Sequence, residues 1–116
     1  MTSASDISLV YRHIAGALDR EDRELLTSAM AEAPRAAADG VDQHFGIPRG
    51  LPDATWAVKQ GWGSSGDRRV LNSTGFVQLD GTYVVTLLSS WRKDADLATT
   101  SAALTKAAEA LRSTMR

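Results

Sequence analysis

The chain contains no cysteine and carries little net charge. Without cysteine it can form neither disulfides nor a catalytic thiolate, and its redox compartment is left open. Its 116 residues have a formal net charge of -1, and the sequence pI is about 6.1. Proteins that bind nucleic acid or anionic membranes normally present clustered lysine and arginine. We therefore expect neither nucleic acid nor a membrane surface as a partner.

Long hydrophobic runs are also missing. No apolar stretch approaches the roughly 20 residues needed to cross a bilayer, and residues 1–6 lack the basic start and apolar core of a signal peptide. The sequence as written therefore predicts a cytoplasmic protein. If a signal and an N-terminal half precede it in the natural product, the expectation changes to a secreted or periplasmic location.

Residues that bind metals or cofactors are scarce. The only histidines, His13 and His44, are too few and too isolated for a metal site. Asp39 and Asp42 lie in a segment rich in glycine and proline, where acidic residues usually serve turns. The glycines near Trp62 do not open a helix, so they lack the context of a phosphate-binding loop. We predict no metal and no cofactor.

The first half of the chain predicts two helices and an irregular segment. At this length, with 43% hydrophobic and 23% charged residues, a single globular domain is expected. Ser3 or Ser5 can cap the first helix, and the second ends near Pro34. The two should form a helical hairpin over residues 1–34, followed by an irregular segment over 35–55. The inward-facing positions are expected to be Ile7, Val10, Tyr11, Ile14, Leu18, Leu25, Leu26, Ala29 and Met30.

The second half predicts antiparallel strands over residues 56–90 and a C-terminal helix over 94–115 that begins at Asp96 or Thr99. The fold class is therefore α+β, with three strands and two long sheet edges that need cover. A turn is expected at Gly63–Arg69, and the Asp80-Gly81 pair favours a second hairpin. The expected strands are Trp56–Gln60, Val70–Val77 and Thr82–Ser89.

The segment Trp56–Trp62 ends its strand pattern with a lysine, a polar residue and a glycine. Lys59 has two interpretations, a surface lysine at a strand end or a cation that faces a groove and meets an anion. Gly61 favours the second, because a residue without a side chain on an edge strand lets another backbone approach and pair. Trp56 and Trp62 are typical of aromatics that pack on a sheet. The residues alone leave both interpretations open.

Three segments and the final helix together resemble the last half of a known fold. The segments are Lys59–Trp62, Val70–Gly75 and Thr82–Leu88. Their order and spacing resemble the class A β-lactamases and penicillin-binding serine hydrolases, particularly those of actinobacterial type. This family carries a Ser-x-x-Lys nucleophile, a Ser-Asp-Asn motif and a Lys-Thr-Gly strand. Lys59 and Gly61 match the third motif, while Gln60 replaces its hydroxyl residue.

The resemblance implies a role for each matching residue. Lys59 would bind the carboxylate of a small-molecule or peptide substrate, Gly61 would permit backbone approach, and the Trp62 N–H would be an oxyanion-hole donor. Gln60 would still donate and accept hydrogen bonds. Arg68 would reach the same carboxylate if the second strand is counted back from Gly75.

The chain has no Ser-Asp-Asn motif, and it has no Ser-x-x-Lys before Lys59, where the family carries its nucleophile. The leading hypothesis is therefore the C-terminal portion of a β-lactamase-like serine hydrolase, acting on β-lactam, peptide or ester substrates in the family and inactive alone. The alternative is a non-catalytic binding module that uses the open strand edge near Lys59. A third hypothesis is complementation by a separate N-terminal half, so a protein partner at the sheet edge is expected in two of the three.

Overall fold

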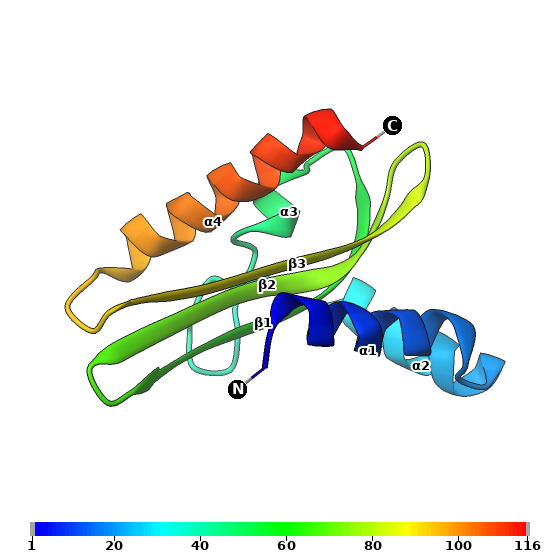
Figure 1. Ribbon diagram of the computed structural model, residues 1–116, viewed down its shortest axis with the longest axis horizontal. Helices are drawn as coiled ribbons and strands as arrows, with labels where there is room; N and C mark the ends of the chain where they lie inside the picture. The colour runs from blue at the N-terminus through cyan, green and yellow to red at the C-terminus, as the bar shows by residue number, and fades with distance from the viewer. Residues whose placement is uncertain (1, 116) are drawn as a thin grey trace.

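The computed structural model describes residues 2–115 and has the α+β architecture that the sequence predicts. Three helices come before a three-stranded antiparallel sheet in the chain, and a long helix with a terminal 3₁₀ turn comes after it (Figure 1). The elements are α1 (Ala4–Gly16), α2 (Arg20–Ala31), α3 (Ile47–Gly50), β1 (Thr55–Ser65), β2 (Arg68–Gln78), β3 (Thr82–Arg92), α4 (Leu97–Leu111) and η1 (Arg112–Thr114).

The sheet is a meander in the order β1-β2-β3, so β1 and β3 are its edges. All three strands are longer than expected, and the predicted turn at Gly63–Arg69 is wrong. The turn consists only of Gly66 and Asp67, because Ser65 pairs directly with Arg68. Gly66 has φ of +59°, which a tight two-residue hairpin turn requires. The polar composition of the flanking residues reflects a solvent-exposed hairpin end.

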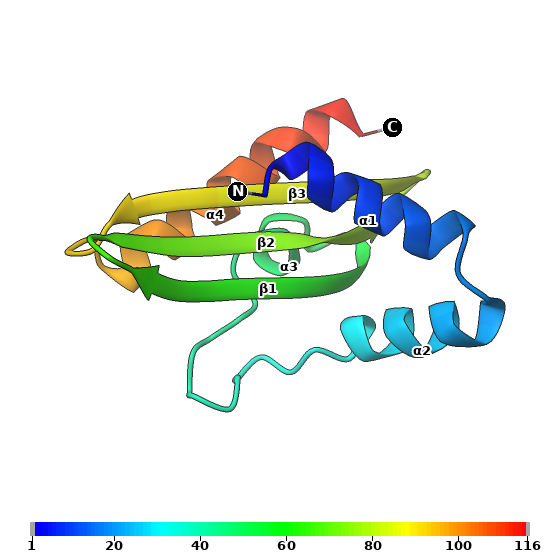
Figure 2. The ribbon, with the colours of Figure 1, turned by 60° about the horizontal axis from the view of Figure 1, so that its bottom comes forward.

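Helices cover both faces of the sheet. The N-terminal helices α1 and α2 lie on one face, and α3 and α4 lie on the other (Figures 1 and 2). Since strand side chains alternate between faces, each strand contributes to both layers. The main hydrophobic core lies between the sheet and α4 and consists of Ile47, Leu51, Val58, Val77, Val85, Ala108 and Met115.

The capping residue of each long terminal helix follows from its hydrogen-bonding chemistry. Ser3 caps α1 in a reciprocal arrangement with Asp6, in which each side chain accepts a backbone N–H from the other residue. Asp96 caps α4 by accepting the N–H of Thr99 at 2.7 Å. Both caps were among the positions that the sequence predicted.

The face covered by α1 and α2 is packed more loosely than predicted. Tyr11 is buried, but Val10 is 54% exposed, and Leu25 and Leu26 are 70% and 42% exposed. The expectation that these three point inward is wrong. Helix α2 contributes no buried residue at all, although it lies against β1. No other residue between 2 and 115 covers these exposed apolar side chains on α1 and α2.

The segment predicted to be irregular contains the short helix α3. Pro48 occupies its first turn, where a missing backbone N–H costs nothing. Gly46 precedes it with φ of +69°, and the Ile47 N–H donates to the Ser73 hydroxyl at 3.0 Å. A four-residue helix held by tertiary contacts leaves too short a periodic pattern to be seen in the sequence.

Candidate functional site

Lys59 and Gln60 point to opposite faces of β1. Lys59 is exposed, and its Nζ donates to the carbonyl oxygen of Gln60 at 2.7 Å. The Gln60 side chain is 2% exposed, and its amide nitrogen donates to the carbonyl oxygens of Gln43 and Phe45. Its Oε1 is buried with no hydrogen-bond partner among the described residues. Gln60 thus ties the 43–45 loop to the sheet.

Trp62 lies on the same face as Gln60 and packs edge-on against Phe45, with ring centroids 6.4 Å apart. Its indole N–H donates to Asp39 at 2.8 Å, and this hydrogen bond is the largest cause that holds the Asp39 pKa below its usual value. A Cβ at Gly61 would meet only Asn72, at ordinary contact distance. None of the residues from 2 to 115 therefore packs closely enough to require a glycine at position 61.

Arg68 lies far from Lys59. Lys59 pairs with Thr74, which is six residues along β2 from Arg68, a separation of about 20 Å. Arg68 instead donates to the hydroxyl and carbonyl oxygens of Ser90. Lys59, Gly61 and Trp62 lie near one another on β1, but the fold does not bring Arg68 to them.

The acidic residues of the 35–46 segment have the turn-forming role that the sequence predicts. Asp39 accepts the N–H of Val41, and Asp42 accepts the N–H of His44 at 3.0 Å. The His44 backbone N–H is the largest cause that lowers the pKa of Asp42. No group of three or more metal-ligating side chains occurs anywhere between residues 2 and 115.

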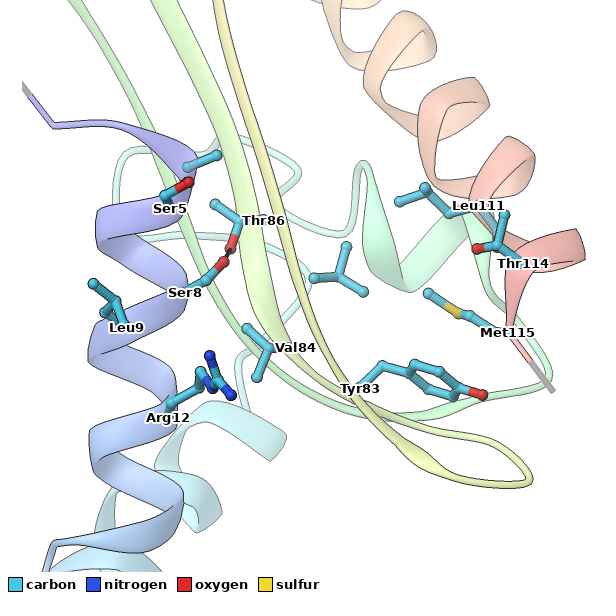
Figure 3. A pocket seen from close by; sticks show the side chains of 12 residues that line it. Ser5, Ser8, Leu9, Arg12, Tyr83, Val84, Thr86, Leu111, Thr114 and Met115 are labelled. Carbon is cyan, nitrogen blue, oxygen red and sulfur yellow. Dashed lines mark hydrogen bonds between the residues drawn. The ribbon is translucent and has the colours of Figure 1, made fainter.

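A groove of about 590 Å³ runs along the outer edge of β3 (Figure 3). Its floor is the strand from Tyr83 to Thr86. Helix α1 forms one wall, and the end of α4 with η1 forms the other. The groove therefore opens at the side of the sheet between the two helical layers, where a further strand would lie.

The two-residue turn between β1 and β2 determines which backbone groups of β3 face outward. Residues that flank such a turn form a hydrogen-bonded pair, and bonded and non-bonded pairs alternate along an antiparallel ladder. With Ser65 paired to Arg68, the registers direct the backbone N–H and C=O of Val84, Thr86 and Leu88 away from β2. Two of these three residues line the groove.

Contacts around β3 agree with this assignment. The N–H of Ser89, which should face β2, donates to Asn72 Oδ1 on that strand. In residues 2–115, no group from outside the sheet hydrogen-bonds to the backbone of Val84, Thr86 or Leu88. The sequence did not predict these unpaired groups on β3. It predicted the open edge near Lys59, which lies on β1.

Helix α1 is held firmly against β3 and makes the first wall rigid. Ser8 and Thr86 share a hydrogen bond between their hydroxyls at 3.1 Å. The Tyr11 hydroxyl lies 2.7 Å from Thr74 Oγ1, and the Tyr11 ring packs edge-on against Phe76 at 5.1 Å. Burial is the main cause that raises the pKa of Tyr11 above its usual value. The groove is thus built on a preformed contact between helix and sheet.

A second groove, of about 530 Å³, lies between α4 and the loop before α3. Two of the charges on its rim already pair, since Arg49 donates to Asp42 at 3.0 Å. The Thr105 hydroxyl in its lining is also engaged, because it accepts the N–H of Gly46. The β3 groove, with free backbone groups, is therefore the better candidate site.

The chain is similar to mycobacterial proteins that bear the name "Putative lipoprotein LppW". Those of Mycobacterium bovis and Mycobacterium tuberculosis are each 32% identical over 111 residues, a match that covers 92% of this chain and 35% of theirs. The chain thus spans about a third of the length of the curated relatives it matches. No family model and no solved structure matches it.

These relatives overturn the predicted membership of the β-lactamase and penicillin-binding protein family, and with it the serine-hydrolase function. The similarity runs to a protein named as a lipoprotein, and nothing in the comparisons points to a hydrolase. A lysine, a polar residue and a glycine are a weak signal without a nucleophile, and the structure places them inside β1 rather than at its end. The cytoplasmic location has no support from these relatives either. No helix within residues 2–115 is long and apolar enough to span a membrane.

Proposed function

We propose that this chain is an interaction domain of a cell-envelope protein and that it binds an extended segment of polypeptide along the outer edge of β3. An added strand would accept hydrogen bonds from the outward N–H groups of Val84, Thr86 and Leu88 and donate to their C=O groups. The observation that carries this proposal is the combination of these unpaired groups with a groove between two helical walls. Unprotected edges of this length normally invite pairing.

The occupant we propose is a segment equivalent to one in the two thirds of the mycobacterial relatives that lie outside the match. Exposed apolar side chains support this choice, since Leu9, Val10, Leu25 and Leu26 are 61%, 54%, 70% and 42% exposed. Apolar stripes of this kind on packed helices are typical of surfaces that another part of a protein covers. One longer polypeptide would cover both these helices and the sheet edge.

The envelope location rests on the name that the relatives carry, which describes them as lipoproteins. We infer that the natural product is attached to the membrane or exposed at the cell surface through a part outside this chain. Fractionation of the source cells, with detection by an antibody against α4, should recover the protein with the envelope. Recovery in the cytosol alone would contradict this location.

Overlapping peptides offer a direct test of strand addition. Fifteen-residue peptides that tile the unmatched two thirds of the Mycobacterium tuberculosis relative are titrated into the ¹⁵N-labelled chain. At least one peptide should shift and protect the amides of Val84, Thr86 and Leu88. If no peptide affects these amides, or if protection appears at the β1 edge instead, the proposal fails.

A pair of substitutions at Thr86 separates strand addition from ordinary surface binding. Thr86→Pro removes an outward N–H, so it should leave the bonds between β2 and β3 in place and abolish the binding of the added strand. Thr86→Val keeps the N–H and removes only the hydroxyl that contacts Ser8, so it should bind. Equal binding by both variants would contradict the proposal.

A further inference from the structure

The two walls of the β3 groove differ in chemistry, and the difference bears on which segment would bind. This inference rests on the proposed strand addition. The α1 wall presents Ser5, Ser8 and the cation Arg12, whereas the wall from α4 and η1 presents Leu111 and Met115. Figure 3 shows these side chains on opposite sides of β3. Because a strand alternates its side chains between faces, its odd and even positions would meet different surroundings.

The register along α1 relates each position of an added strand to a side chain of that wall. Ser8 contacts Thr86, so the neighbouring position of an added strand would face serine hydroxyls. Arg12 is one turn further along α1, about 6 Å, and Val84 is two residues back along β3, about 7 Å. Tyr11 packs on Phe76, which pairs with Val84, and this contact confirms the direction.

Arg12 is exposed and has no hydrogen-bond or ion-pair partner among residues 2–115. The other arginines of this face are engaged, since Arg20 pairs with Glu24 at 2.9 Å and Arg23 donates to the carbonyl of Ala15. Arg12 is therefore the charge that an incoming segment would meet at the open edge of the sheet.

We propose that the segment bound at β3 alternates in a defined way. It carries an acidic residue opposite Val84, where it pairs with Arg12, and a small or hydroxyl residue opposite Thr86. Between them, opposite Val85, it carries a large apolar residue that packs against Leu111 and Met115. The pattern acidic, apolar, small identifies the partner as an amphipathic strand with an anion on its α1-facing side.

The test uses two synthetic peptides that differ in one charge. Both are nine residues long, alternate threonine and valine, and carry a single glutamate or lysine at a threonine position. A peptide can slide by two residues along the edge, so its charge can reach Arg12 in either strand direction. Binding is measured from amide shifts of Val84 and Thr86 in the labelled chain and in the charge-reversed variant Arg12→Glu.

The parent chain should bind the glutamate peptide about threefold to fivefold more tightly than the lysine peptide, as expected for a partly exposed ion pair. Arg12→Glu should reverse this preference while melting at the parent temperature. If both peptides shift the β3 amides equally in both proteins, strand addition stands and the acidic preference is overturned. If neither peptide shifts them, the alternating pattern is wrong, and the tiled peptides decide strand addition separately.

Discussion

Replacement of Gly75 by alanine tests the sheet on which the candidate site is built. Gly75 lies in the middle of β2, opposite Val58 on β1 and Val85 on β3. A Cβ at this position would overlap the carbonyl oxygen of Ala57 and lie 2.9 Å from the Cα of Val58. These atoms belong to the backbone of the adjacent strand, so a side-chain rotation cannot relieve the clash.

The expected cost follows from this geometry. Overpacking in a well-packed interior costs about 1 to 3 kcal/mol, and a backbone clash belongs at the upper end of that range. Alanine regains roughly 0.5 to 1 kcal/mol by restricting the unfolded chain. The net loss in the free energy of unfolding for Gly75→Ala is therefore about 2 kcal/mol, or roughly 8 °C in Tm for a domain of this size.

Urea unfolding followed by circular dichroism measures this loss. Gly63→Ala is the matched control, because Gly63 is also a strand glycine but has no atom within 4 Å of the added Cβ. It should change stability by less than about 0.5 kcal/mol. If Gly75→Ala were as stable as Gly63→Ala, the close approach of β1 and β2 at the pairing of Val58 with Gly75 would be refuted.

Two further substitutions test α1 and α4. Tyr11→Phe should lower stability by about 1 kcal/mol and speed amide exchange in α1, because the buried Tyr11 hydroxyl loses its bond to Thr74; unchanged stability would contradict this anchor. The hydrogen bond from the Thr99 backbone N–H is the largest cause that holds the pKa of Asp96 below its usual value of 3.8. The stabilisation that the ionised Asp96 cap gives is therefore fully present above pH 3.8 and is lost as the pH falls through the folded pKa. Asp96→Asn should therefore flatten the acid limb of a plot of stability against pH, and an unaltered limb would argue against the cap.

The fold class was predictable because strong local signals point to it. The period of α4, the cap at Asp96 and the Asp80-Gly81 turn are all local and need no tertiary information. Strand ends were less predictable, because polar residues continue β1 and β2 to an exposed hairpin tip at Gly66. The exposure of Leu25 was missed because periodicity identifies an apolar stripe but not whether anything covers it.

The candidate site was less predictable than the fold. The sequence drew attention to Lys59 and Gly61 because a lysine and a glycine near an expected strand end match a motif. Both residues instead lie inside β1, and the Lys59 amine turns back to its own strand. The free edge of β3 has no sequence signature, since its residues Val84 and Thr86 are ordinary strand formers. Only the strand order and the registers show which backbone groups remain unpaired.

The most direct test of strand addition at β3 is a set of backbone NOEs between the chain and the bound segment. The chain is labelled with ¹³C and ¹⁵N and mixed with the unlabelled tiled peptide that binds best. Strand addition predicts cross-strand NOEs from the backbone protons of Val84, Thr86 and Leu88 to the peptide, together with slowed exchange of their amides. NOEs confined to β1, or to helix side chains without any from the β3 backbone, would contradict it.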